Sequence, residues 1–400
     1  MHEAYYSARK HKRTKPEQLR FEYEYDAKLY ELCQLIATQQ YEPLPANVFV
    51  TRKPVHREIF APQFRDRVVH HLIYNYLYDY LDRKFIYDSY SCRVGKGTMF
   101  GIERAKSFMR KVSRNYTQDA YVLKLDISGY FMNINRKLLY AKLQQMIDYT
   151  ALDITKTEQK SLEYLLKVNT LHDSTKNAIR KSPLHYWDTI PRSKSLFHTA
   201  SDCGLPIGSL TSQLFSNVFL NDIDHRIKQH ISHYGRYVDD MLLMHQDRET
   251  LRAVIPMVNQ WLGEIGLQLH PGKIVLQHYS KGFYFLGQYI KPGCCYISRR
   301  LKKHIFIFQK ELEAYFALPR QKELKELQLV ENKLNSYFGV LAKANTYQWT
   351  KLWVDRLPQN LKKYMDLAYD EATQQMKASL KSAYKIKNNY TRECYSFTHL

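Results

Sequence analysis

Hydrophobic and polar positions follow two different periods along this chain, and they divide it into predicted helices and strands. Apolar residues at helical spacing predict helices at 21–41, 61–81, 99–112, 135–147, 159–168, 214–227 and 249–265. Short apolar runs bounded by polar or glycine residues predict strands or hairpins at 49–60, 121–127, 237–244, 266–277 and 282–290. After residue 297 the chain is basic and helical to about residue 385. Strands mixed with helices in this order indicate an α+β fold with antiparallel pairing.

The stretch Gly235–His245 places two adjacent carboxylates, Asp239 and Asp240, between two apolar runs. This pattern predicts a hairpin with the acidic pair at its turn. A tight hairpin turn normally carries glycine, and none is present at this tip, which suggests local backbone strain. Adjacent carboxylates repel each other unless a cation neutralises them. By itself, the stretch fits an ordinary solvent-facing turn as well as it fits a cation site.

A further acidic residue lies at the end of a predicted buried strand. The run Tyr121–Ile127 is mostly apolar, and burial of Asp126 without a cation or hydrogen-bond donors would be costly. A helix-capping role is the alternative, but no helix begins directly after it. If this strand neighbours the hairpin, Asp126, Asp239 and Asp240 converge. Three convergent carboxylates suit two Mg²⁺ ions about 3.5–4 Å apart, which promote phosphoryl transfer.

Composition adds a polyanionic partner to this picture. The 400 residues contain 60 Lys+Arg against 39 Asp+Glu, a net charge of +21. Such an excess favours nucleic acid over membrane as the partner. The 33 Tyr and 18 Phe supply rings that can stack on bases, although most of them must form the core. The 6 Cys contain no C-x-x-C pair, and no signal peptide or membrane-spanning run is evident, so we expect a cytoplasmic protein.

Five sequence blocks follow one another along the chain: Leu125–Phe131, Gly204–Gln213, Tyr237–Asp240, a block with Lys273, and Phe285–Gly287. They occur in the order found in reverse transcriptases, and the chain resembles that family over about 49–290. One block is a weak signal, whereas five in order are specific. The resemblance implies a right-hand polymerase fold with fingers, a palm containing an antiparallel sheet, and a C-terminal helical thumb. It also implies an RNA-directed DNA polymerase.

The resemblance implies metal-binding and proton-transfer roles for individual residues. Asp126 and Asp239 would be the main ligands of two Mg²⁺ ions, with Mn²⁺ as the alternative ion. Asp240 would assist them, and the carbonyl of Ile127 would contribute. Lys273 would either donate a proton to departing pyrophosphate or position a phosphate.

The resemblance also implies a nucleotide site. Lys53 and Arg57 would hold the incoming triphosphate, and Arg67 is a further candidate unless it pairs with Asp66. Phe131 falls at the steric-gate position, where a bulky ring excludes a ribose 2′-OH and so selects dNTPs. The other implied positions are Ile207 and Gly208 for the nucleotide, Gln213 for the template, and Phe285, Leu286 and Gly287 as the primer grip.

Two departures from the family pattern narrow the resemblance. The usual Gln before Gly208 is Ile207, and the usual Pro at the end of that block is Gln213. Together with 64–71, 87–98 and 344–347, this block is similar to the reverse transcriptases of bacterial diversity-generating retroelements and related defence-associated lineages. Because Ile207 lacks a hydrogen-bonding side chain near the nascent base pair, we expect looser base selection.

The predicted domains follow from these blocks. They are an N-terminal helical extension at 1–48, fingers at 49–120, a palm at 121–297 with an insertion at 150–203, a helical thumb at 298–385, and a tail at 386–400. Hydroxyls in the tail are candidate protein primers, and a disordered tail without such a role is the favoured alternative; the candidates are Tyr390, Tyr395 and Ser396.

The predicted function is the copying of a cognate non-coding RNA into cDNA, in a diversity-generating retroelement or in antiphage defence. The expected partners are template RNA, the cDNA or primer, dNTPs, and a small accessory protein or a second reverse transcriptase. The alternative is a catalytically silent nucleic-acid-binding protein with a polymerase fold.

Overall fold

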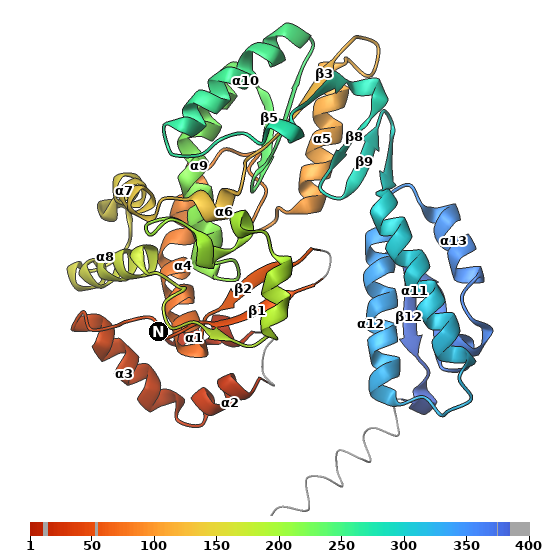
Figure 1. Ribbon diagram of the computed structural model, residues 1–400, viewed down its shortest axis with the longest axis horizontal. Helices are drawn as coiled ribbons and strands as arrows, with labels where there is room; N and C mark the ends of the chain where they lie inside the picture. Colours follow the sequence, from red (N-terminus) through yellow and green to blue (C-terminus); the bar gives the residue numbers. More distant parts are fainter. Residues whose placement is uncertain (11–14, 53–54, 374, 385–400) are drawn as a thin grey trace, which may run out of the picture. The chain divides into compact units, whose positions relative to one another are not determined.

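The computed structural model describes residues 1–10, 15–52, 55–373 and 375–384, which fall into two compact units, Met1–Gln277 and His278–Leu400 (Figure 1). The helices of the first unit are α1 (His2–Arg9), α2 (Pro16–Glu22), α3 (Tyr25–Ala37), α4 (Phe64–Lys84), α5 (Thr98–Val112), α6 (Tyr130–Asn133), α7 (Arg136–Met146), α8 (Lys156–Leu171), α9 (Leu210–His230) and α10 (Arg248–Gly263). The strands up to the unit boundary are β1 (Asn47–Thr51), β2 (Arg57–Ala61), β3 (Tyr121–Asp126), β4 (Ile179–Arg180), β5 (His233–Tyr237), β6 (Asp240–His245) and β7 (Val275–His278).

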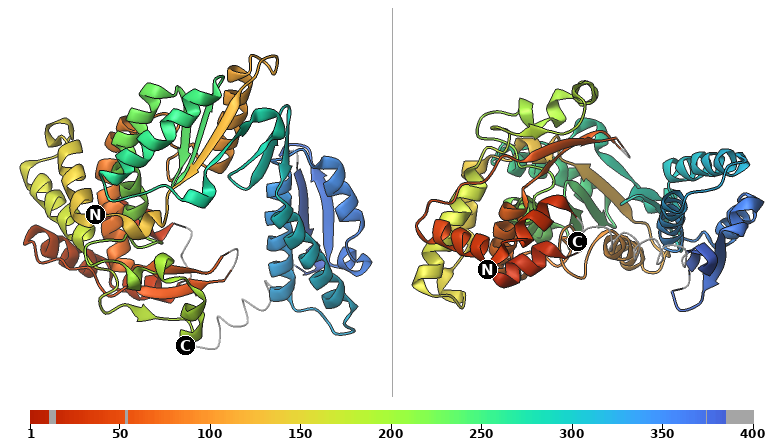
Figure 2. Two further views of the ribbon diagram at one scale, coloured as in Figure 1. Left: turned by 45° about the horizontal axis from the view of Figure 1, so that its top comes forward. Right: turned by 90° about the horizontal axis from the view of Figure 1, so that it is seen from below.

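A four-stranded sheet in the order β5-β6-β3-β7 forms the centre of the first unit (Figure 2, left). Strand β6 pairs antiparallel with both β5 and β3, as the sequence predicts. Leu123 and Leu243 point into the large hydrophobic core that α9 and α10 complete. Because side chains alternate across a strand, Asp126 and Asp240 lie on the opposite face of the sheet from these leucines.

The predicted hairpin at 49–60 is present as β1 and β2, which pair antiparallel. Parallel pairing of the short β4 with β1 extends it to a three-stranded sheet in the order β2-β1-β4. The long helix α4 follows the hairpin directly. Tyr5 of α1 and Phe21 of α2 contact Phe64 of α4, so the N-terminal helices share the core of the first unit.

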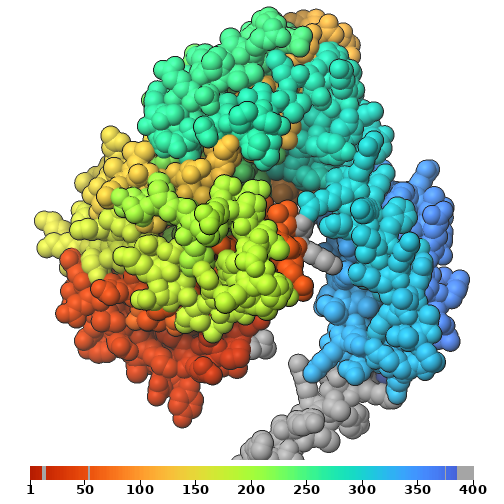
Figure 3. All heavy atoms as spheres, in the orientation of Figure 1, coloured from red at the N-terminus to blue at the C-terminus, as the bar shows by residue number. Residues whose placement is uncertain are grey.

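The predicted insertion at 150–203 contains one long helix and one irregular segment. Helix α8 begins with a capping box in which Thr155 and Glu158 exchange hydrogen bonds, which fixes its first turn. The remaining segment, 172–203, consists of β4, short 3₁₀ turns and loops. Figure 3 shows this segment, in yellow-green, spread over one face of the first unit.

In its described residues, the second unit combines a small sheet, three helices and a hairpin. Its elements are β8 (Phe283–Phe285), β9 (Gln288–Lys291), β10 (Cys294–Ile297), α11 (Arg299–Ala317), α12 (Leu324–Leu341), α13 (Tyr347–Asp355), β11 (Met365–Asp370) and β12 (Gln375–Leu380).

Two features of this unit differ from the prediction. The unit boundary precedes residue 297, where the palm was predicted to end, because Asn345 and Cys295 exchange two hydrogen bonds of 2.8 Å that join the β8–β10 sheet to the helices. The C-terminal region is also not entirely helical, since β11 and β12 form a hairpin. Asn335 of α12 exchanges two 2.8 Å hydrogen bonds with the backbone of Ala378 in β12, a distant contact that no local pattern reveals.

No helix in the described part of the chain combines the length and apolar character needed to cross a membrane.

Candidate active site

The strand register brings two of the predicted carboxylates together. Asp126, the last residue of β3, lies directly opposite Asp240, the first residue of β6. Residues that face each other across an antiparallel pair have Cβ atoms about 4.5–5.5 Å apart and point to the same side. Asp239 precedes Asp240 in the hairpin turn. The Asp-Asp stretch is therefore neither isolated nor an ordinary surface turn, because Asp126 faces it from the neighbouring strand.

The hairpin turn has the strain that the missing glycine predicts. Val238 has φ of 58°, a left-handed conformation that is rare for a β-branched residue. The Arg236 guanidinium donates a hydrogen bond of 2.9 Å to the carbonyl oxygen of Val238 and so stabilises the turn. That carbonyl contact ties the conformation of the acidic turn to a single arginine.

Arg236 is itself fixed by a buried ion pair that sequence analysis missed. Its Nε and Nη2 atoms donate to the two carboxylate oxygens of Asp224, on α9, at 2.8 and 2.6 Å. Both side chains are 1% exposed. The hydroxyl of Tyr234 donates a third hydrogen bond to Asp224. An arginine directly before a predicted strand and an aspartate among the apolar residues of a predicted helix were the available signals.

Each member of the Asp126–Asp240 pair is bound by a lysine. Lys273 Nζ lies 2.8 Å from an oxygen of Asp126, and Lys124 Nζ lies 3.2 Å from an oxygen of Asp240. Lys273 was predicted to act at this site, whereas Lys124 was not. Lys124 lies two residues before Asp126 and thus on the same face of β3, so strand periodicity could have identified it.

Two of the acidic groups have raised pKa values, and burial is the largest cause for both. Burial raises the pKa of Asp239, the charge of Asp126 raises it further, and the charges of Lys273 and Arg57 oppose the increase. Burial likewise raises the pKa of Asp240 to about 6, against the opposing effect of Lys124. Raised carboxyl pKa values mark a site that an additional cation would stabilise.

These residues have the oxygen ligands that suit a divalent cation, but they are not arranged as a preformed metal site. Carboxylate and carbonyl oxygens are the ligands that Mg²⁺ and Mn²⁺ prefer. The amide of His270 donates to the carbonyl of Asp126, and the amide of Ser128 donates to the carbonyl of Gln268. Because carbonyls alternate along a strand, the carbonyl of Ile127 points away from the segment 268–270. Among the described side chains, however, no group of three acidic, histidine or cysteine residues is close enough to hold a metal ion as placed.

The nucleotide positions are only partly described. Arg57, the first residue of β2, is exposed, and its charge acts on Asp239. Lys53 lies outside the described residues. Arg67 donates to the carbonyl of Ala8 in α1, and Asp66 pairs instead with Arg65, so the predicted alternative of an Arg67–Asp66 pair is wrong.

Phe131 and Ile207 pack against one small apolar cluster that also contains Phe60 of β2. The carbonyl of Phe131 accepts a hydrogen bond from the Leu205 amide, and the carbonyl of Ile207 accepts one from the Phe60 amide. The structure thus brings together the predicted steric gate, the position where the family has Gln, and the fingers hairpin.

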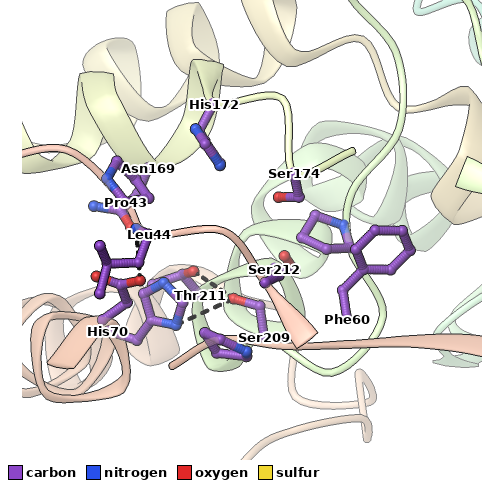
Figure 4. A pocket seen from close by; sticks show the side chains of 14 residues that line it. Pro43, Leu44, Phe60, His70, Asn169, His172, Ser174, Ser209, Thr211 and Ser212 are labelled. Carbon is purple, nitrogen blue, oxygen red and sulfur yellow. Dashed lines mark hydrogen bonds between the residues drawn. The ribbon is translucent and has the colours of Figure 1, made fainter. Parts of the chain in front are cut away.

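Position 208 accommodates only glycine without strain. Its φ is 119°, and an added Cβ atom would lie 2.8 Å from the carbonyl oxygen of Phe60. Its neighbour Ser209 borders a cavity of about 40 Å³ in which its hydroxyl lies 3.4 Å from Nδ1 of His70 and 2.9 Å from the hydroxyl of Thr211 (Figure 4). Burial lowers the pKa of His70 to about 4, so this imidazole is neutral at pH 7.

Gln213 lies in the second turn of α9, where two adjoining hollows follow α4. One hollow is lined by Arg67, His71, Gly208 and Gln213, and the other by Tyr74, Val94 and Gln213, among other residues. The predicted template position therefore lies beside the nucleotide position Gly208.

The predicted primer-grip residues belong to the second unit. They form the turn between β8 and β9, where Leu286 and Gly287 have φ of 48° and 84°. Phe285 is buried beneath this turn.

A comparison with models of known protein families identifies the family of this chain. The model of the reverse transcriptase (RNA-dependent DNA polymerase) family matches residues 52–290. This chain therefore belongs to the reverse transcriptase family, and the prediction of an RNA-directed DNA polymerase with an α+β polymerase fold is confirmed. Members of this family generally use divalent metal ions.

The chain is similar to individual proteins at low identity. Protein YkfC of Escherichia coli (strain K12) is 22% identical over 293 residues, which are 62% of this chain and 67% of that protein. A Candida tropicalis apo telomerase truncated from its C-terminal domain aligns with a TM-score of 0.45 and 13% identity, over 68% of this chain and 60% of that one. A Candida albicans telomerase in complex with a telomeric RNA fragment aligns with a TM-score of 0.42 and 12% identity, over 85% and 64%. The chain thus spans less than two thirds of either telomerase chain.

Proposed function

We propose that this reverse transcriptase copies a cognate non-coding RNA into cDNA by nucleotidyl transfer that uses two divalent metal ions. The observation that carries the proposal is the register pair Asp126–Asp240 with Asp239 beside it. Two of these three carboxyl groups have raised pKa values in a chain of net charge +21. Two bound Mg²⁺ ions would stabilise the attacking 3′-oxygen and the departing pyrophosphate.

We assign the carboxylates unequal roles. Asp126 and Asp239 hold the ions, helped by the carbonyl of Ile127. Asp240 assists them, as the family resemblance implies, and it also pairs with Lys124. Lys273 is paired with Asp126 and would move to a phosphate oxygen of the nucleotide, either to position it or to give pyrophosphate a proton.

The neighbouring residues select and hold the nucleotide. Arg57, with Lys53, binds the triphosphate, because a guanidinium and an ammonium complement phosphate oxygens. Phe131 rejects the ribose 2′-OH, and the Ile207–Gly208 backbone lies under the nascent pair. Gln213 borders the template strand. The Phe285–Gly287 turn is assigned to the primer by family resemblance alone.

The decisive experiment is primer extension on an RNA template with Mg²⁺ and labelled dNTPs, comparing wild type with Asp239→Asn. We expect the variant to lose at least about a thousandfold in rate, because a neutral amide cannot replace a metal-binding carboxylate. Asp222→Asn is the matched control, since Asp222 is exposed and, among the described residues, its ion-pair partner is Lys142. Equal extension by wild type and Asp239→Asn would refute the assignment.

A catalytically silent protein is the second candidate, and the lysine-bound carboxylates are the observation that favours it. It predicts RNA binding without incorporation. If wild type incorporates no dNTP on a generic template, sequencing of the RNA that copurifies with the protein supplies the cognate template for a second extension assay. Failure on that template as well would support the silent form.

For the biological role we propose a diversity-generating retroelement or antiphage defence, on the basis of the Ile207–Gln213 block. A template and variable repeat pair beside the gene, with a small accessory protein, supports the first role. Loss of phage resistance in an Asp239→Asn strain supports the second. The tail hydroxyls Tyr390, Tyr395 and Ser396 lie outside the described residues.

A further inference from the structure

The irregular segment 172–203 is attached firmly to the fingers hairpin. The backbone amide of Ile179 donates to the carbonyl of Ala46 at 2.8 Å, and that of Lys181 donates to the carbonyl of Val48, in β1, at 2.7 Å. The buried carboxylate of Glu58 in β2 accepts hydrogen bonds from the Ser195 hydroxyl at 2.6 Å and the Leu196 amide at 2.8 Å. Polar contacts this well satisfied hold a loop in one conformation.

Stacked side chains stabilise the segment from within. The Arg180 guanidinium lies 4.4 Å from the ring centre of Phe197 and 5.2 Å from that of Trp187. Arg52 of the fingers hairpin lies 4.9 Å from the ring of Tyr186 in the same way. These contacts reach from the fingers hairpin across the segment, so its surface is a preformed one.

This surface presents cations without carboxylate partners. Lys176, Lys181, Arg192 and Lys194 are all exposed, and within the described chain none of them is in an ion pair. Three acidic residues lie in the segment. Asp202 pairs with Lys137, and Asp173 accepts hydrogen bonds from Thr175 and also interacts with the charge of Lys176. Asp188 is exposed, so the four exposed cations outnumber the exposed carboxylate on this face.

One end of the segment lies against the palm loop that carries Phe131. A Cβ atom added to Gly129 would be 3.4 Å from the carbonyl oxygen of Ser193. Ser193 separates Arg192 from Lys194, so these two cations lie beside the loop that follows Asp126. The surface therefore extends from the edge of the fingers sheet to the border of the active site.

We propose that the exposed face of 172–203 binds the phosphate backbone of RNA outside the few nucleotides that occupy the active site. This inference rests on the proposed function, since it assigns the surface to the same RNA that is copied. Four exposed ammonium and guanidinium groups suit phosphates, whose neutralisation releases counterions. A preformed surface binds with a smaller entropy cost than one that must order on contact.

RNA fits this surface better than an acidic protein or a membrane does. Large apolar side chains, which drive protein docking and membrane insertion, are scarce on it; Leu184, 66% exposed, is the main exception. Hydroxyl groups accompany the cations, including that of Ser193, and hydroxyls commonly donate to phosphate oxygens.

The test compares two quadruple variants that remove equal charge. The variant that tests the segment 172–203, called the insertion variant below, is K176Q/K181Q/R192Q/K194Q. The control variant is R110Q/K156Q/K160Q/K167Q, whose four cations are also exposed, lie in the same unit and are free of ion pairs with described residues. Matching thermal unfolding temperatures for both variants and wild type would show that each is folded.

Two RNA probes separate this surface from the active site. The long probe is an unstructured 40-nucleotide RNA, and the short probe is a primer–template hybrid with a three-nucleotide RNA overhang. We expect the insertion variant to bind the long probe about tenfold more weakly at about 0.15 M salt, with a salt slope lower by roughly 2 to 3. Its binding and extension of the short probe should equal those of the control variant.

Three outcomes would overturn the proposal. They are unchanged binding of the long probe, an equal loss in the control variant, and an equal loss on the short probe. The binding measurement uses fluorescence anisotropy and needs no nucleotide incorporation. Absence of extension by every form, on the cognate template as well as on the short probe, would therefore contradict the proposed function, while a selective loss of long-probe binding would still support this surface.

Discussion

The two hairpins that carry the charged residues of the site are held in place in opposite ways. The carboxylate hairpin, β5–β6, is fixed from within the core, by the buried Arg236–Asp224 pair and by β3. The fingers hairpin, β1–β2, is fixed from its outer edge, by β4 and by the contacts of Glu58. Damage to the first should reduce the stability of the whole unit. Damage to the second should change nucleotide binding while the core stays folded.

The largest expected effect is that of Arg236→Met. It leaves Asp224 buried without its partner, and loss of one member of a buried pair costs about 3–5 kcal/mol. We expect this decrease in the free energy of unfolding, measured with urea, together with loss of primer extension.

The double variant Arg236→Met/Asp224→Leu separates stability from positioning. It removes both charges, so much of the stability should return, although the Tyr234 hydroxyl loses its acceptor. Extension should remain slow, because the carbonyl of Val238 still lacks its donor. A stable double variant with the wild-type rate would show that the turn does not depend on Arg236.

Acid should lower the free energy of unfolding, because the buried His70 of α4 is neutral in the folded chain. His70 has a pKa of about 4 in the folded chain, against about 6.5 when unfolded. The unfolded chain therefore binds the extra proton first, so this stabilisation is complete above pH 6.5 and is lost as the pH falls towards 4. The loss amounts to about 3 kcal/mol.

Urea unfolding at a series of pH values between 7.5 and 4.5 measures this effect. His70→Gln should be less sensitive to pH than wild type, and burial also lowers the pKa of His172, so part of the dependence should remain. An identical pH dependence in the variant would contradict the role of His70.

A smaller effect is expected for Glu58→Ala. It leaves the Ser195 hydroxyl and the Leu196 amide without an acceptor, at a cost of about 1–3 kcal/mol. Because Arg57 adjoins Glu58, we expect the KM for dNTP to rise severalfold while kcat changes little. Steady-state extension kinetics measure both values.

Glu58→Gln is the matched control for the fingers hairpin. It keeps one acceptor oxygen and should lie between the wild type and Glu58→Ala. If KM is unchanged in both variants, the insertion does not position the fingers hairpin.

The smallest effect concerns fidelity. Ile207→Gln restores the hydrogen-bonding side chain usual in the family and should lower the misincorporation frequency severalfold, with little change in stability. Sequencing of cDNA from a defined RNA measures this frequency, and Ile207→Leu controls for packing. An unchanged frequency would contradict the idea that Ile207 loosens base selection.

The sequence alone identified the reverse transcriptase family and predicted the chemistry of its site. Asp126 ends a predicted strand and Asp239-Asp240 fills a predicted turn, so alternation along antiparallel strands was enough to suggest that they meet. The fingers hairpin and most long helices were also predictable, because each rests on local periodicity. Their bounds differ from the predictions by a few residues.

Tertiary structure decided the contacts that hold this site. The Arg236–Asp224 pair, the Lys124–Asp240 pair and the Glu58 contacts join residues that are 12, 116 and about 137 positions apart. The β11–β12 hairpin depends on Asn335 in the same way. Local patterns cannot specify such partners, because the cost of burying a charge or an amide is met only when folding brings a distant group to it.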